Sequence, residues 1–265
     1  MREGECVFNL LVTCVGSKSR EGPSIKDVLN GLLANGKRND IDALFTEWKK
    51  VLTQQMAAPG HLTEARWLYK GPLWNASMDA FNKIKQPRNL WVISCGFGLI
   101  NSGQMLSGYK ATFKLRESDS LFDRNFFHGS DEDAVKRKWW NLLSQNGILD
   151  TSHPRSIHDL VNGSGPEDVV LVAAGKDYYE AIYGDLDRID TSRNGPKMAF
   201  VGIKRLYRGF EPDVPEKLKP FIQSYSDGIK LREFLGCGGI QIHSKSAEFL
   251  IDRYYKTGEL KYEFP

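Results

Sequence analysis

The sequence has 265 residues, of which 41% are hydrophobic and 26% are charged, and its formal net charge is +3. This balance is ordinary for a globular protein and argues against a largely disordered chain. No run of about 18 apolar residues occurs, and the apolar run near the N-terminus is too short for a signal peptide, so we expect neither a membrane span nor a secretory leader. The four cysteines are scattered without metal-ligand spacing, which favours reduced thiols, a cytoplasmic location and no metal or other cofactor.

The order of apolar and amphipathic segments predicts an α/β protein. Apolar runs predict strands at residues 6–13, from residue 90, at 168–173, at 198–203 and, as a short strand, at 238–242. Helices are predicted at 25–33, 41–55, 72–84, 130–145, 157–161, 176–186 and 220–234, and after the turn at 243–246. We therefore expect one domain over residues 1–265, a central and mostly parallel sheet flanked by helices in a three-layer sandwich. Its core is 6–203, and residues 204–265 extend it by a strand, a loop and a helix.

Three of the predicted strands end in loops of small and polar residues, at 13–19, 94–98 and 173–178. Ligands of open α/β sheets bind in the crevice outside the carboxyl ends of the strands. We therefore expect the three loops to meet at one site. The first two supply eight candidate binding residues: Cys14, Gly16, Ser17, Lys18, Ser94, Gly96, Phe97 and Gly98.

The loop after the first strand has the composition of an anion site. Backbone amides around Gly16 and Ser17, with the Lys18 ammonium nearby, suit a phosphate group. The spacing is not that of a Walker A loop, and an ordinary polar turn is the alternative interpretation.

The segment at 63–74 is dense in aromatic and cationic residues. Arg66, Tyr69 and Lys70 suit stacking on a nucleotide or neutralising it. We predict that the two tryptophans of this segment, Trp67 and Trp74, belong to the core.

Five further candidates lie in the remaining loops and turns. Tyr109 belongs to a long loop at 101–113 and is placed against a substrate, with simple packing as the alternative. Asp177 follows the strand at 168–173, where it is either a helix cap or a polar contact for a ligand. His243 is expected at a strand end beside a helix N-terminus, where Ser244 and Lys245 favour an anion; a core histidine is the alternative.

Two segments, 136–140 and 204–208, mix cations with aromatic residues. Such segments suit a DNA backbone and would make the affinity depend on salt, although a solvated basic face explains them equally well. No Gly-x-Ser-x-Gly motif occurs, which argues against the common hydrolase triad.

Taken in order, four motifs resemble the bacterial domain family related to YaaA, the peroxide-stress protein. They are TCVGSKS at 13–19, ARWLYKGPLW at 65–74, ISCGFGLI at 93–100 and VLVAAGKDY at 170–178. The resemblance covers about residues 6–186, and Gly108-Tyr109-Lys110 stands where Pro-Tyr-Asp is usual in the family. The chain is also similar to the Brig-type anti-phage DNA glycosylases and, more distantly, to uracil-DNA glycosylases.

This resemblance implies a glycosylase that flips a modified base out of phage DNA and leaves an abasic site. From the residues we expect this enzyme to be cytoplasmic and free of metal, and we expect it to act as a monomer. The implied base is glucosylated hydroxymethylcytosine. Two alternatives stay open: a non-catalytic nucleic-acid or nucleotide-binding protein of stress or defence, and a nucleotide N-glycosidase or deoxyribosyltransferase.

On the glycosylase hypothesis, each candidate has an expected role. Ser17, Lys18 and the backbone of the 96–98 turn would hold phosphate or sugar, and Tyr69 or Tyr109 would stack on the base. His243 would donate a hydrogen bond to the departing base. Asp177, or alternatively Asp119 or Asp123, would stabilise the positively charged sugar.

Overall fold

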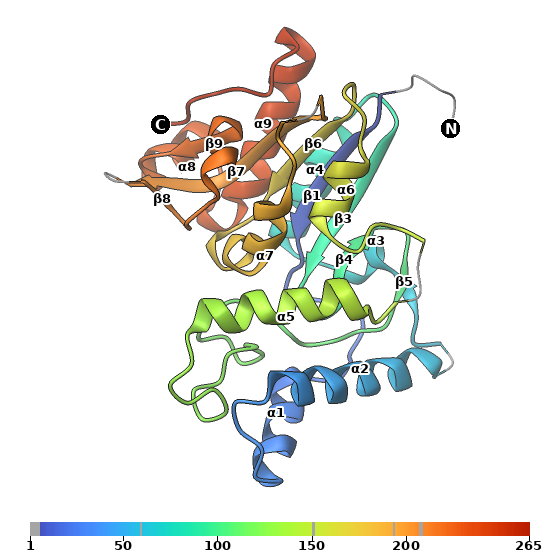
Figure 1. The fold of residues 1–265 in the computed structure, drawn as a ribbon. Coiled ribbons are helices and arrows are strands. Elements are labelled where there is room, and N and C mark those ends of the chain that lie inside the picture. The colour runs from blue at the N-terminus through green and yellow to red at the C-terminus, as the bar shows by residue number, and fades with distance from the viewer. Residues whose placement is uncertain (1–5, 59, 150–151, 193, 207–208) are drawn as a thin grey trace.

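The computed structural model describes residues 6–58, 60–149, 152–192, 194–206 and 209–265 (Figure 1). Seven strands form one sheet in the order β4-β3-β1-β6-β7-β8, and β9 also pairs with β7. The strands are β1 (Phe8–Thr13), β3 (Arg88–Ser94), β4 (Gly98–Asn101), β6 (Val169–Ala173), β7 (Lys197–Leu206), β8 (Gly209–Glu211) and β9 (Ile222–Tyr225).

The centre of the sheet is parallel. β3, β1, β6 and β7 run in the same direction, whereas β4 and β8 pair antiparallel at its ends. Every residue of β1 and β6 is buried, as expected for parallel strands covered on both faces. The predicted α/β class with a mostly parallel sheet is therefore confirmed.

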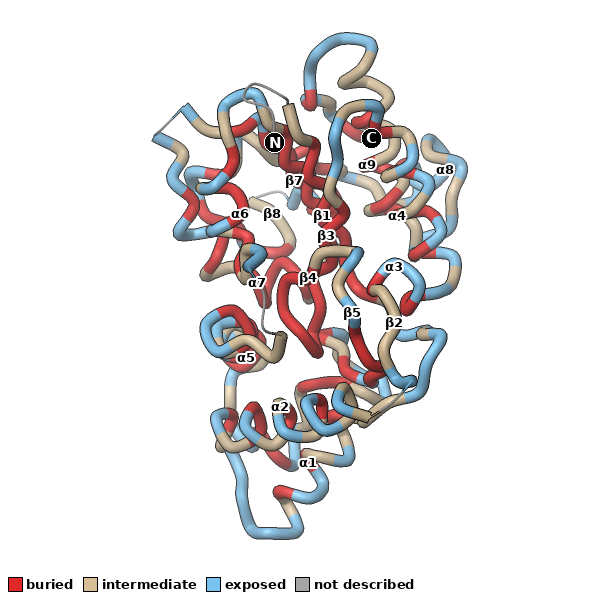
Figure 2. Tube along the Cα trace, turned by 90° about the vertical axis from the view of Figure 1, so that its right-hand side faces the viewer, coloured by how far each residue is buried: buried red, intermediate tan, exposed pale blue. Residues whose placement is uncertain are grey.

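Helices cover both faces of the sheet (Figure 2). α6 (Ile157–Gly163) and α7 (Lys176–Arg188) lie on one face. α4 (Pro72–Asn82) and α9 (Ile242–Thr257) lie on the other, where α9 packs against β6 and β7 and α8 (Gly228–Leu235) packs on α9. This arrangement is the predicted three-layer sandwich.

Three more helices lie beyond the carboxyl ends of the parallel strands: α1 (Ile25–Ala34), α2 (Ile41–Ala57) and α5 (Glu132–Asn146) (Figure 1). Two buried indoles attach α2 and α5 to the turn between β3 and β4. Trp48 on α2 donates to the Gly96 carbonyl at 2.9 Å, and Trp139 on α5 donates to the Cys95 carbonyl at 2.8 Å. These bonds satisfy the carbonyls of a buried turn and fix the helices beside the strand ends.

Three predicted segments differ from the structure. Residues 238–242 form no strand, because Gly239–Gln241 is a short 3₁₀ helix that leads directly into α9. The predicted helix at 220–234 is instead the end of a 3₁₀ helix (Glu216–Phe221), then β9, then α8. The loop at 101–113 contains β5 (Met105–Leu106), which pairs with β2 (Thr63–Glu64) ahead of the short helix α3 (Ala65–Leu68). In each case the contact that decides the structure is distant in sequence.

The two tryptophans of the 63–74 segment have different surroundings. Trp74 is buried, as predicted, whereas Trp67 is 63% exposed and the prediction of a core position was wrong. Of the second cation and aromatic segment, residues 207 and 208 lie outside the described residues. Within the described part of the chain, no helix has the length and apolar character needed to cross a membrane.

Candidate functional site

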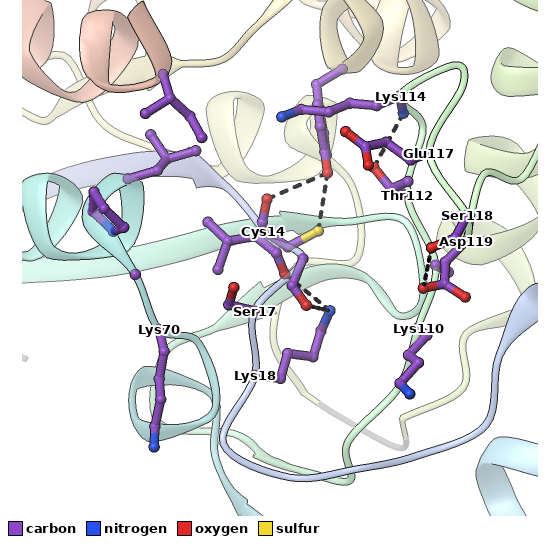
Figure 3. Close-up of a pocket in the computed structure, with 18 residues that line it drawn as sticks. Cys14, Ser17, Lys18, Lys70, Lys110, Thr112, Lys114, Glu117, Ser118 and Asp119 are labelled. Atoms are coloured by element: carbon purple, nitrogen blue, oxygen red, sulfur yellow. Dashed lines mark hydrogen bonds between the residues drawn. The ribbon is translucent and has the colours of Figure 1, made fainter. Parts of the chain in front are cut away.

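A cavity of about 380 Å³ opens beside the carboxyl end of β1 (Figure 3). Its volume falls within the range of ~300–1,000 Å³ typical of small-molecule sites, and its place at the strand ends is where α/β sheets bind ligands. It is lined by the loop after β1, the start of α4, the loop at 110–119, one residue of α7 and one residue before α9: Cys14, Val15, Gly16, Ser17, Lys18, Lys70, Gly71, Pro72, Leu73, Lys110, Ala111, Thr112, Lys114, Glu117, Ser118, Asp119, Tyr178 and Ile240.

The charges around this cavity are mainly positive. Four lysines line it, Lys18, Lys70, Lys110 and Lys114, against two carboxylates, Glu117 and Asp119. Lys110 forms an ion pair at 2.8 Å with Glu21, outside the lining. The remaining surplus of positive charge favours an anionic ligand, such as a phosphate ester.

Lys18 is the most enclosed of the four lysines. Its Nζ donates to the Val15 carbonyl at 3.0 Å and lies 4.1 Å from the centroid of the Tyr109 ring. Burial lowers the pKa of the Lys18 ammonium, and the Cys14 and Cys95 thiols and the Asp119 carboxylate counter that effect only in part. Lys18 therefore gives up its proton more readily than an exposed lysine.

Tyr69 and Tyr109 were predicted to contact a substrate. They do not line the cavity and instead form a chain of buried hydroxyl groups beneath Lys18. The Tyr69 and Tyr109 hydroxyls lie 2.9 Å apart, and the Tyr109 hydroxyl lies 2.7 Å from Ser94 Oγ. Ser94 Oγ accepts from the amides of Gly96 and Phe97, each at 3.1 Å. The structure gives no support for the prediction that Tyr69 or Tyr109 stacks on a substrate, because both side chains are buried.

The turn between β3 and β4 supports that chain and contributes no lining residue to the cavity. A methyl group at Gly96 would lie 2.5 Å from the Tyr109 ring, so only glycine fits there. Gly98, at a φ of 84°, is likewise confined to a backbone region that glycine favours. Ser94, Gly96, Phe97 and Gly98 were predicted as ligand contacts and are found as supports for the strand ends.

The wall of the cavity near β1 contains Cys14 and Tyr178. The Cys14 thiol lies 3.2 Å from the Tyr178 hydroxyl, which also donates to the Cys14 carbonyl at 3.4 Å. Cys14, Gly16, Ser17 and Lys18 therefore lie together, as the sequence predicted for the loop after the first strand.

Asp177 does not line the cavity, because an ion cluster between α5 and α7 holds it. Its Oδ1 accepts from Lys136 Nζ at 3.0 Å, and the same amine contacts Glu180 at 2.7 Å and Asp133 at 3.4 Å. Lys136 is 1% exposed, so the prediction that its side chain faces water or phosphate was wrong. A role for Asp177 as the carboxylate beside a substrate is not supported by this position.

His243 lies in the first turn of α9 rather than at a strand end. Its ring packs closely against two glycines. A methyl group added at Gly175 would lie 3.0 Å from Nε2 of His243, and one added at Gly202 would lie 2.4 Å from Nδ1 of His243. Its Nδ1 is shielded from solvent and has no hydrogen-bond partner among the described residues. Burial, and to a smaller degree the charge of Lys114, lower the pKa of His243 to about 4, so the imidazole is neutral near pH 7.

The two residues after His243 contact protein groups. Ser244 Oγ lies 2.7 Å from Ser77 Oγ of α4 in a buried contact, and Lys245 donates to Glu248 at 2.6 Å within α9. Neither side chain lines the cavity, so the structure gives no support for their predicted role in anion binding. The expected strand end is absent, because α9 begins before residue 243.

Arg66 lies in α3, whereas Lys70 lies in the short segment that joins α3 to α4. Lys70 lines the cavity, whereas Arg66 does not and instead contacts Glu64 and the Trp67 ring. The Lys70 amide donates to the Ser17 carbonyl at 3.0 Å, which brings this segment beside the loop after β1.

The polar lining residues of the 110–119 loop other than Asp119 had no assigned role in the sequence: Lys110, Thr112, Lys114, Glu117 and Ser118. Their only sequence signal is an irregular, charged tract between two regular segments. Asp119, which the sequence offered as an alternative to Asp177, does line the cavity. Across the described ranges, no group of three or more histidine, cysteine, aspartate or glutamate residues is arranged to hold a metal ion.

The chain was also compared with known proteins. No protein-family model matches the sequence, and no curated protein matches it significantly.

The low pKa of His243 predicts a loss of stability on acidification. Below about pH 6.5 the unfolded chain binds a proton at this residue, whereas the folded chain does so only near pH 4, so stability falls as pH falls through this window. At ~1.4 kcal/mol per pKa unit, and with allowance for partial exposure, we expect a loss on the order of 2 kcal/mol. Urea unfolding at pH 7 and pH 5 should show a smaller loss for His243→Gln than for the unchanged protein. Equal losses of stability in the variant and the unchanged protein would contradict the assignment of this pH dependence to His243.

Proposed function

We propose that this protein is a DNA glycosylase that removes a modified base and leaves an abasic site. The observation that carries the proposal is the cavity at the strand ends, which combines a surplus of lysines with carboxylates in one enclosure. An extruded nucleotide presents an anionic phosphate and a sugar whose bond to the base is broken through a positively charged transition state. A site for this reaction needs both kinds of charge.

The exposed lysines at the rim hold the DNA backbone in this proposal. Lys70 and Lys114 are exposed cations on different segments of the lining, and in Figure 3 Ser17 and Lys18 of the loop after β1 appear between Lys70 and Lys110. Extrusion of a base costs a few kcal/mol, which contacts to its flanking phosphates offset. The amides around Gly16 and Ser17 then contact the phosphate or sugar of the extruded nucleotide.

Asp119 is the carboxylate that we assign to the sugar. Ser24 Oγ donates to its Oδ1 at 2.7 Å and Ser118 Oγ donates to its Oδ2 at 3.3 Å, so the carboxylate is held in place. A fixed negative charge of this kind stabilises the positive charge that develops at C1′ as the base departs.

The departing base takes negative charge, which Lys114 and the Tyr178 hydroxyl stabilise in this proposal. A role for His243 as the donor is weaker than the sequence implied, because its imidazole is neutral and shielded at Nδ1. We place it instead as a support beneath the ends of β6 and β7, next to Lys114.

The substrate follows from the resemblance to the anti-phage glycosylases. We propose phage DNA with glucosylated hydroxymethylcytosine as the target, and a cytoplasmic monomer as the acting species. The test is to incubate the protein with unmodified, hydroxymethylated and glucosylated DNA, and to measure released base and abasic sites.

The expected result is base release from glucosylated DNA only. Binding of DNA without release would overturn the proposal in favour of a non-catalytic binding protein. Release from free nucleotides but not from DNA would favour a nucleotide N-glycosidase or a deoxyribosyltransferase.

A further inference from the structure

The Lys18 amine differs from the other amines of the cavity in its surroundings. Lys70 and Lys114 are exposed, and Lys110 is paired with Glu21. Lys18 is partly buried, and among the described residues no carboxylate oxygen lies within 4.0 Å of its Nζ. Its near neighbours are a backbone carbonyl and the face of the Tyr109 ring.

The position of the Lys18 amine is also fixed. Val15 and Gly16 carbonyls accept from Nζ at 3.0 and 3.5 Å, and residue 18 forms a backbone bridge with Tyr69. Figure 3 shows the side chain folded back toward its own loop, along the wall that Cys14 and Ser17 share. A pre-positioned amine loses less side-chain freedom when it reacts than a mobile surface lysine does.

Such an amine has the properties of a nucleophile. An amine attacks carbon only in its neutral form, and desolvation is one of the ways in which proteins keep a lysine neutral. Burial acts on Lys18 in this direction, as its lowered pKa indicates. The exposed amines at the rim stay hydrated and suit electrostatic contacts with phosphate instead.

From this geometry we infer that Lys18 is a covalent nucleophile toward the C1′ aldehyde of the sugar that remains after base release. The inference rests on the proposed glycosylase function. The neutral Lys18 nitrogen adds to C1′, the carbonyl π electrons move to oxygen, and one proton passes from the nitrogen to that oxygen. A second proton, from solvent, lets the resulting hydroxyl leave as water while the nitrogen lone pair forms the C=N bond, which gives a protonated imine. Addition of water reverses the sequence and releases the sugar.

Trapping with cyanoborohydride tests this inference without any need for base release. Hydride adds to C1′ of the imine and leaves a stable secondary amine that links protein to DNA. The full-length protein is mixed with DNA that already carries an abasic site, and the cross-link is measured as a shifted band. We expect a cross-link that maps to Lys18 by peptide mass spectrometry and that falls about tenfold or more in Lys18→Arg.

Lys256→Arg is the matched control, because Lys256 is an exposed lysine near the end of α9, distant in the fold from the cavity. Its cross-link should equal that of the unchanged protein. A cross-link on Lys70, Lys110 or Lys114, or an undiminished yield in Lys18→Arg, would overturn the inference, as would no cross-link at all. Because the abasic DNA is made beforehand, a protein that cross-links but releases no base would contradict the proposed function and leave this inference standing.

Discussion

Replacement of Asp119 by asparagine is expected to slow base release by about 100-fold or more, because it removes the only charge that we assign to the sugar. Asparagine keeps the size of the side chain, its carbonyl oxygen can still accept from Ser24, and its NH2 group can donate to the Ser118 hydroxyl oxygen, so the fold should be retained. The rate of abasic-site formation on glucosylated DNA under single-turnover conditions gives the measurement.

Asp79→Asn is the control for this prediction, since Asp79 is an exposed carboxylate on α4 that does not line the cavity. Its rate should match that of the unchanged protein. If Asp119→Asn keeps the full rate while its thermal unfolding is normal, the sugar must be stabilised by another group. Asp177→Asn tests the carboxylate that the sequence first favoured. We expect this substitution to lower the stability of the protein more than the rate of base release, because Asp177 contacts Lys136 and does not line the cavity.

The parallel strands β1, β3, β6 and β7 were predictable because they carry local signals, whereas β4, β8 and β9 were not predicted. β6 is a continuous apolar run and β1 is mainly apolar, and a parallel sheet buries such runs on both faces. The place of the loop after β1 at the cavity was also predictable. The carboxyl end of a parallel strand in an α/β sheet faces the ligand crevice, whatever lies elsewhere in the chain.

The tail of the chain was not predictable in this way. Ile240 and Ile242 are two residues apart, which is typical of a strand, yet Ile240 is 55% exposed and Ile242 is buried in the first turn of α9. The contacts that fix this helix are distant in sequence, such as Ser244 with Ser77. His243, Ser244 and Lys245 were therefore assigned to a strand end that does not exist.

The far wall of the cavity escaped prediction for a different reason. The loop at 110–119 has no periodicity, and it is placed by single long-range contacts, including the bond from Ser24 to Asp119 and the backbone bond from the Ile25 amide to the Lys110 carbonyl. A single sequence gives no signal for such contacts. The burial of Lys136 also had no signal in the sequence. Its neighbours in the helix are charged, which is typical of an exposed face, yet its own amine is buried.

Replacement of Lys136 by methionine is expected to destabilise the protein by about 3–5 kcal/mol, the range for removal of one partner from a buried ion pair. Its amine contacts Glu180 at 2.7 Å and Asp177 at 3.0 Å between α5 and α7, and without it these carboxylates face each other in a poorly solvated space. Burial lowers the pKa of Lys136, but the hydrogen bonds to Glu180 and Asp177 outweigh that effect and raise the pKa overall, so the amine is charged at neutral pH. Urea unfolding at pH 7.5 gives the measurement.

The pH dependence separates the loss of charge pairing from a simple loss of packing. Burial raises the pKa of Glu180, and the bond to Lys136 partly opposes this, so removal of the amine raises that pKa further. A carboxyl group with a raised pKa in the folded state binds its proton more tightly there than in the unfolded chain, so stability increases as pH falls. The deficit in stability of Lys136→Met should therefore be smaller at pH 5 than at pH 7.5, and addition of Glu180→Gln should restore part of it at pH 7.5.

The control is Lys138→Met, which removes an exposed cation of the same helix paired with Asp42. This variant should lose less than about 1 kcal/mol of stability at either pH. Equal losses for the two lysine variants, or a deficit of Lys136→Met that does not change with pH, would show that the cluster between α5 and α7 contributes no more than a surface ion pair.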